Sequence, residues 1–403
     1  MRPGFAATDE AISLRTTLFA EYTVQQFRFG AEMYDSRVYL ADGDGAVTNN
    51  EVNALELPQA YVAGDFGNVL DQDVDATVHL GRLMINLGSR RLVAADDYRN
   101  TTSGYTGARI DLKRKTGGTA TLLYTLPQRR LPDDMASILD NDIELDRESS
   151  DLVLWGALFT TPKLAASAAV DFGYFRLNER DAPDLATRDR RLDTVTVRAF
   201  RDPAAGQVDF ELEGAYQTGQ IRVSTSANAP DLDVAASFYR VRLGYQWAAP
   251  IRPRLAFEYD VASGDESGGR YGRYDTLFGM RRADFSPSGI YATIGRTNLR
   301  SPGLRFEFMP GDRTEAFIMY RALWLDSSTD SFATSNVRDA TGRSGDFAGH
   351  QIDSRLRYWI VPQSLRFEAN AVWLAKGGFL RDAPNAPDTG DATYLSLNLQ
   401  ATF

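Results

Sequence analysis

The last twelve residues of the chain, Ala392 to Phe403, alternate strictly between apolar and polar side chains. Leu395, Leu397 and Leu399 occupy every second position, and the side chains between them are polar. Successive side chains of a β-strand point to opposite faces, so this pattern predicts a strand with one apolar and one polar face. Any fold that contains this strand must offer an apolar environment on one side and water on the other.

The same alternation recurs through most of the chain, and no segment keeps the period of a helix. Near the start, Ile12, Leu14 and Leu18 lie on one side of a predicted strand and Arg15 on the other. We count roughly seventeen segments long enough for a tilted membrane-spanning strand. They are residues 12–20, 27–34, 55–64, 76–87, 108–114, 119–125, 152–160, 166–176, 193–201, 208–217, 236–247, 254–262, 304–309, 314–325, 351–359, 366–374 and 392–403.

The connections between these segments alternate between short and long. Short turns, such as 115–118 and 202–206, are separated by long segments rich in Gly, Asp, Asn and Ser, such as 126–151. Outer-membrane β-barrels have short turns at one rim and long loops at the other. We therefore predict an all-β fold in a single domain, residues 1–403: a transmembrane antiparallel β-barrel.

The direction of the strands predicts one more strand than we count. Counting back from the last strand, the segment that begins at Ile12 runs toward the periplasmic rim, so a strand of opposite direction is expected before it. Bacterial single-chain barrels usually have an even number of strands. We predict a design of about eighteen strands whose first strand is missing or incomplete in this chain, or only hinted at before Asp9.

Composition excludes several classes of protein. The chain has 403 residues, of which 43% are hydrophobic, and no apolar run approaches the length of a membrane-spanning helix. Its net charge of -10 argues against nucleic-acid binding, and the absence of cysteine excludes disulfides and thiolate metal sites. Residues 1–5 begin no apolar segment, so we expect any signal peptide to have been removed. We expect no metal and no other cofactor.

The polar face of the predicted strands carries many charged side chains. Arginine stays charged and binds carboxylates through two parallel hydrogen bonds, so a ladder of arginines inside a pore would attract and relay anions. The alternative is that these residues form ion pairs that brace the barrel wall. The predicted pore-lining and substrate-binding residues are Arg15, Arg28, Glu32, Arg82, Arg198, Arg240, Arg242, Glu258, Asp260, Arg305, Arg321, Arg355 and Arg357.

Other motifs are less informative. Residues 42–51 resemble a calcium loop, but the glycine and the glutamate stand at the wrong positions for an EF-hand, and we interpret them as a polar external loop. His79 is predicted to face lipid, and His350 lies at a loop edge beside Asp353, which would point to the other face, so we expect no enzyme. The longest connection, residues 263–303, is predicted to be an extracellular or constriction loop. Its aromatic and basic residues include Tyr271, Tyr274, Arg281 and Arg282.

Two segments resemble sequences of the alginate export porin family. The better match runs from His79 to Leu92 and continues through Asp97–Asn100, although Leu83 stands where the family usually has Gln; the weaker match joins Leu14–Arg15 to Phe27–Gly30. The last strand is similar to the C-terminal strand that the barrel assembly machinery of Gram-negative bacteria reads. The resemblance implies an eighteen-stranded barrel in which Arg15 and Arg82 line an electropositive constriction for an acidic polysaccharide.

These observations predict a monomeric, porin-like channel of the bacterial outer membrane. It would pass an anionic solute by diffusion or export, most simply an acidic polysaccharide such as alginate or its oligosaccharides, and would contact outer-membrane lipid. The alternative is a structural or adhesin-type barrel with a closed lumen. Anion-selective current across a planar bilayer would distinguish the two, and solubility without detergent would indicate a soluble sandwich instead.

Overall fold

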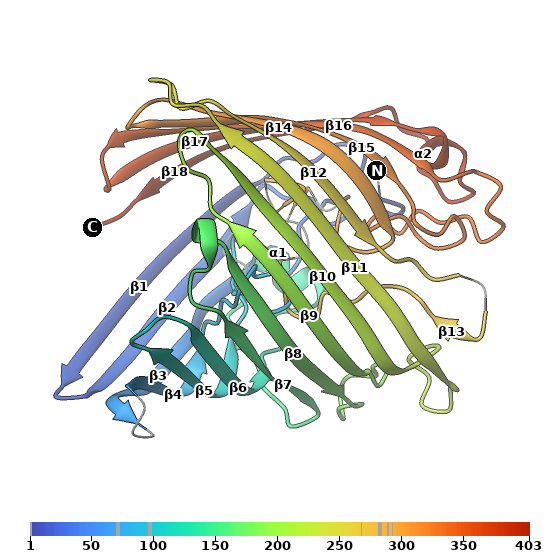
Figure 1. Ribbon diagram of the computed structural model, residues 1–403. Coiled ribbons are helices and arrows are strands. Elements are labelled where there is room, and N and C mark those ends of the chain that lie inside the picture. Colours follow the sequence, from blue (N-terminus) through green and yellow to red (C-terminus); the bar gives the residue numbers. More distant parts are fainter. Residues whose placement is uncertain are drawn as a thin grey trace.

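A computed structural model describes residues 2–69, 73–95, 99–266, 268–280, 284–287, 290–291 and 293–403. The predicted residues Asp97, Tyr98, Arg281 and Arg282 lie outside these ranges. The described residues form eighteen strands, which belong to one sheet, and two short α-helices and one 3-10 helix, which lie between strands (Figure 1). The elements are β1 Ile12–Val24, β2 Phe27–Tyr39, β3 Asn53–Val69, β4 Val74–Leu83, β5 Tyr105–Arg114, β6 Thr119–Pro127, α1 Met135–Asp140, β7 Leu152–Thr160, the 3-10 helix Ala165–Ser167, β8 Ala169–Glu179, β9 Arg191–Arg201, β10 Gln207–Arg222, β11 Asp231–Gln246, β12 Arg254–Ala262, β13 Arg270–Tyr271, β14 Leu299–Gly311, β15 Thr314–Trp324, β16 Phe347–Val361, β17 Leu365–Lys376, α2 Gly378–Asp382 and β18 Ala392–Ala401.

The sheet is a meander in which each long strand pairs antiparallel with the next long strand. The exception is β13, which has two residues and pairs parallel with β11. The sheet curves round loop segments that lie within it (Figure 1). Within the described residues β1 and β18 do not pair with each other, so the barrel is open between them. The predicted all-β antiparallel barrel is confirmed, whereas the missing first strand stays a prediction.

The strands separate an outward face from an inward face, as their alternation predicts. In β18, Leu395, Leu397 and Leu399 are 71%, 77% and 67% exposed and lie on the outward face. Ser396 of the same strand accepts a hydrogen bond from Asn370 of β17 on the inward face. Leucines exposed in a row suit hydrocarbon better than water.

The connections confirm the predicted alternation of short turns and long loops. Residues 25–26 and 312–313 are tight turns at one rim, whereas residues 128–151 and 325–346 are long loops at the other. The loop 128–151 contains α1, whose first turn is capped by the Asp134 carboxylate accepting from the Ser137 backbone N–H. Among the described helices, none is long and apolar enough to cross a membrane.

Apolar cores fill part of the barrel interior near the long loops. One core joins inward residues of β5 to β12 with the loop residues Ile85 and Leu277, and another joins β14 to β17 with Phe332 and Phe379. The strand predicted at residues 76–87 is shorter in the structure, where β4 ends at Leu83. The apolar residues that follow, Ile85 and Leu87, pack inside the barrel rather than against lipid. The alternation is misleading here because both faces of the wall are apolar at this height.

Candidate functional site

Five arginines and six carboxylates form one connected set of ion pairs inside the barrel, which we call the central ion network. Its members project from the inward face of β8 to β12 and β15, and from the loops 84–104 and 263–298. They are Arg91, Arg198, Arg240, Arg296, Arg321, Asp171, Glu211, Glu213, Glu258, Asp260 and Asp284.

Arg240 is the centre of this network. Its guanidinium lies 2.7 Å from Asp260, 3.1 Å from Glu258 and 3.3 Å from Glu211, and the residue is 3% exposed. The register explains these contacts, because Arg240 lies directly across from Asp260 on β12 and from Glu213 on β10, and Glu211 is the next residue on the same face of β10. Removing one member from such a buried set leaves the others uncompensated.

The structure thus brings together five of the predicted site residues. Arg321 reaches Glu258 at 2.5 Å and Asp260 at 3.3 Å, and Arg198 reaches Glu211 at 2.7 Å. Each of the five arginines of the central ion network has a carboxylate partner. For these residues the arrangement matches the predicted alternative, in which ion pairs brace the wall.

The loops supply members that the sequence did not identify. Arg91 contacts Glu211 and Asp284, each at 2.9 Å, and also Glu213, whereas Arg296 pairs with Asp284. Burial alone would raise the pKa of the Asp284 carboxyl, but Arg91 and Arg296 outweigh burial and hold this pKa well below its usual range. Loop residues follow no strand alternation, so their inward orientation has no sequence signal.

Two inward arginines nearer the short turns have no carboxylate partner among the described residues. Arg242 of β11 makes no hydrogen bond or ion pair with the residues that the structure describes, and its Nε is buried. Arg355 of β16 lies over the ring of Phe317, with 4.9 Å between the guanidinium carbon and the ring centroid, and has no ion pair with the described residues. Arg305 lies over the same ring at 3.5 Å and pairs with Glu307 at 2.5 Å.

The remaining predicted residues on this side are paired. Arg357 forms an ion pair with Glu368 of β17 and lies 4.0 Å from Glu315 of β15. The register places Arg357 directly across from both partners. Its guanidinium is therefore held between the two neighbouring strands.

Inward residues of β1 and β2 form a separate group. Arg15 donates to the backbone carbonyl of Arg99 at 3.1 Å and has no carboxylate partner in the part of the chain that the structure describes. Arg28 pairs with Asp65 at 3.0 Å, whereas Glu32 accepts a hydrogen bond from Gln59 at 2.5 Å. Of the two arginines, Arg15 alone has a guanidinium without a carboxylate partner among the described residues.

The register contradicts the predicted inward position of Arg82. Arg82 lies across from Ala60 of β3 and Thr106 of β5, on the same face as Leu80, which is 54% exposed. Its guanidinium pairs with Glu56 at 2.8 Å and Glu148 at 2.9 Å. Arg82 therefore lies on the outward face, at the extracellular end of β4, and is bound to loop 128–151.

His79 is the second residue whose predicted face is wrong. It shares the inward face with Tyr61, at 5.8 Å between ring centroids, and with Asp111, at 3.8 Å. Both errors have one cause: strand alternation places the apolar Leu83, like His79, on the lipid-facing side of the segment 76–87, but Leu83 packs in the interior core. The assignment of alternate residues to the two faces was therefore reversed along the whole of β4.

The other histidine lies on the outward face. His350 Nδ1 is 2.9 Å from the Tyr320 hydroxyl, whereas Asp353 lies on the inward face beside Gln351. A Ser-His-Asp arrangement needs these groups on one side. Within the described residues no group of three or more His, Asp or Glu side chains has a metal-binding arrangement.

The profile of the family described as "Alginate export" matches residues 2–390. The chain belongs to the alginate export family. The predicted resemblance is thereby confirmed, and with it the location in the outer membrane of Gram-negative bacteria and the character of a channel protein. No curated protein matches the chain.

Solved structures agree with this assignment at the level of the fold. OccD3 (OpdP) of Pseudomonas aeruginosa matches 98% of the chain over 87% of its own length, with 12% identity and a TM-score of 0.57. The outer membrane protein OpdK of the same organism matches 96% over 91%, with 11% identity and a TM-score of 0.57. OccAB1 of Acinetobacter baumannii matches 99% over 92%, with 12% identity and a TM-score of 0.56.

Proposed function

We propose that this member of the alginate export family is a passive, anion-selective channel for an acidic polysaccharide or its oligosaccharides. The observation that carries the proposal is the pair of inward arginines, Arg242 and Arg355, that lack a carboxylate partner among the described residues. A guanidinium without an internal partner keeps its donors for the carboxylates of a passing solute.

Conduction requires that each site bind weakly enough to release the solute. Two other arginines on this side of the lumen have carboxylates beside them: Glu307 lies beside Arg305, and Glu368 beside Arg357. They limit the affinity of any one step. Phe317 holds the guanidinium of Arg355 through a cation–π contact, so the cation is positioned without being neutralised.

The central ion network would set the width of the passage. It binds loops 84–104 and 263–298 to the wall through Arg91 and Asp284, which supports the predicted role of residues 263–303 as a constriction. In this arrangement the network narrows the lumen, and the unpaired arginines below it select for charge.

Planar-bilayer recording of the full chain tests the proposal. We expect anion-selective current that is blocked by polyuronate and not by neutral dextran, and Arg355→Gln should lower both the selectivity and the block. The control is Arg201→Gln, which removes one positive charge from the outward face of β9. An unchanged reversal potential in Arg355→Gln, or an equal change in the control, would contradict the proposal.

A second function has its own support. The apolar cores and the fully paired network occupy much of the interior, which favours a structural or adhesin-type barrel with a closed lumen. The absence of current across planar bilayers would favour this second function. Heat-modifiable gel migration verifies that the protein used is folded.

We also propose that the chain inserts as a monomer and that the barrel assembly machinery contacts β18. The support is that β18 pairs only with β17 among the described strands, which leaves one edge available. Crosslinking from Asn398, on this strand, would test the contact. A crosslink to a second copy of the chain instead would contradict it.

A further inference from the structure

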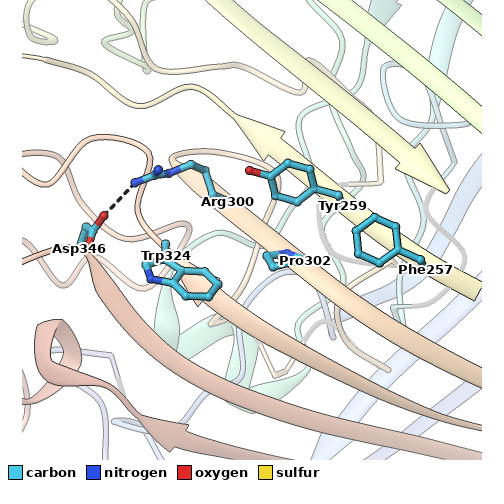
Figure 2. A pocket seen from close by; sticks show the side chains of 6 residues that line it. All are labelled: Phe257, Tyr259, Arg300, Pro302, Trp324 and Asp346. Carbon is cyan, nitrogen blue, oxygen red and sulfur yellow. Dashed lines mark hydrogen bonds and ion pairs between the residues drawn. The ribbon is translucent and has the colours of Figure 1, made fainter.

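A hollow of about 330 Å³ lies on the outward face of β12, β14 and β15, at the extracellular ends of these strands (Figure 2). The register confirms that its walls share this face, because Tyr259 lies across from Pro302 and Arg300 across from Trp324. The hollow therefore faces the membrane and not the lumen. It is lined by Phe257, Tyr259, Arg300, Pro302, Trp324 and Asp346.

The sequence of β14 explains why the wall is hollow at this point. Pro302 has no backbone N–H, and the pairing of β14 with β15 is interrupted between Arg300 and Gly303. The small ring of Pro302 lies between two larger side chains, Tyr259 and Trp324. A depression with aromatic sides results.

The hollow is polar at its extracellular end, on the left in Figure 2, and apolar at its other end, on the right. Arg300 and Asp346 occupy one end and Phe257 the other, as Figure 2 shows. Arg300 is held by its Nη2, which donates to Asp346 at 2.8 Å and to the Leu325 carbonyl at 2.9 Å, and by its Nε, which donates to the same carbonyl at 3.1 Å. Its side chain is 39% exposed, and its Nη1 makes no hydrogen bond to the described residues.

We propose that this hollow binds one lipid of the outer leaflet whose headgroup carries phosphate. The phosphate accepts hydrogen bonds from Nη1 of Arg300, and an acyl chain lies along Trp324 and Phe257. Guanidinium groups bind phosphate through parallel N–H donors, and aromatic residues are typical of the interface between headgroups and chains. Asp346 and the Leu325 carbonyl orient the guanidinium, so that its free edge is presented to the membrane.

Another outward arginine provides the matched comparison. Arg176 of β8 also lies near the extracellular rim and pairs with Asp193 at 3.1 Å. Tyr174 donates a hydrogen bond to the same carboxylate at 2.5 Å. Arg176 has the charge, the rim position and the acidic partner of Arg300, but it does not line this hollow.

Native mass spectrometry of the detergent-purified full chain tests the proposal. The probes are lipid A, which carries two phosphates, and the same lipid with both phosphates removed. We expect one bound lipid A per chain, at least fivefold weaker binding of the dephosphorylated lipid, and a loss of about tenfold in affinity for lipid A in Arg300→Gln. Arg300→Lys should retain much of the binding, and Arg176→Gln should match the unaltered chain.

Several outcomes would overturn the proposal. These are equal binding of the two lipids, unchanged binding in Arg300→Gln, an equal loss in Arg176→Gln, or a mass of two chains without lipid, which would assign the hollow to self-association. Heat-modifiable gel migration verifies that each variant is folded. The test does not depend on conduction, so its failure would leave the proposed channel function intact.

Discussion

The inward wall of the barrel has two regions in which the same residue type has different surroundings. On the wall covered by loops 84–104 and 263–298, Arg240 contacts three carboxylates and is 3% exposed. On the wall of β16, Arg355 contacts an aromatic ring and no carboxylate among the described residues. The comparison teaches that an inward position does not by itself make an arginine a solute-binding residue, because its partners decide its role.

The loops cause this difference. Arg91 and Asp284 reach the covered wall from loops and add both a positive and a negative charge to it. The charges of the wall residues there are therefore compensated by loop residues and not by solvent. Arg355 receives no such partner from the described part of the loops.

The strongest test of the comparison removes the central arginine. Arg240→Met leaves Glu211, Glu258 and Asp260 with too little positive charge, so we expect the free energy of unfolding to fall by about 3–5 kcal/mol. Urea unfolding in detergent, followed by heat-modifiable gel migration, measures the change. In Arg355→Met, the control from the other wall, the free energy of unfolding should fall by at most about 1 kcal/mol. Equal losses in the two variants would contradict the difference between the two regions of the wall.

A smaller effect is expected where a loop joins the covered wall. Asp284→Asn weakens the contacts to Arg91 and Arg296 and should cost about 1–3 kcal/mol. Because the pKa of Asp284 is held well below its usual range, the carboxylate stays ionised above about pH 4, and the contribution is present throughout neutral conditions. If the loop narrows the passage, single-channel conductance should also rise.

The control for this variant is Asp339→Asn. Asp339 accepts hydrogen bonds from Thr341 and Ser344 of its own loop, so its loss should leave conductance unchanged. Equal conductance in Asp284→Asn and the unaltered chain would show that loop 263–298 does not narrow the passage.

The smallest predicted effect concerns loop 128–151. Burial raises the pKa of Asp146 to about 6, and the charge of Glu56 adds to the rise. Because the folded state binds this proton more tightly than the unfolded state, the loop is held more firmly as the pH falls through 6. Between pH 7.5 and 5.5 we expect about fourfold slower tryptic cleavage of the loop, normalised to a peptide at each pH.

Asp146→Asn should abolish this pH dependence, while Asp142→Asn in the same loop should keep it. A pH response that persists in Asp146→Asn would assign the effect to another group.

Sequence alternation predicted the barrel wherever each face met a different medium. In β18, Leu395 and Leu397 face outward and Ser396 inward, as the alternation predicts. In β4 the alternation failed, because Leu83 meets a core inside the barrel and Leu80 meets the outside. Both are leucines at apolar sites, so hydrophobicity alone could not tell them apart, and Arg82 was assigned to the wrong face as a result.

The charged site was predictable only in part. Arg240 and Asp260 could be paired by strand alternation, since they lie on neighbouring strands of one face. Arg91, Arg296 and Asp284 could not, because no local pattern indicates where a loop of this length returns to the wall. The division between paired and unpaired arginines depends on those loop residues.

The apolar packing at the extracellular end has a consequence for engineering. Leu154 and Phe238 are fully buried against residues of the inward loops, as in the core of a water-soluble domain. Shortening such a loop, or exchanging it with that of a relative, would open a cavity in the wall beneath it. The loops and the strands below them should therefore melt as one cooperative unit and have to be redesigned together.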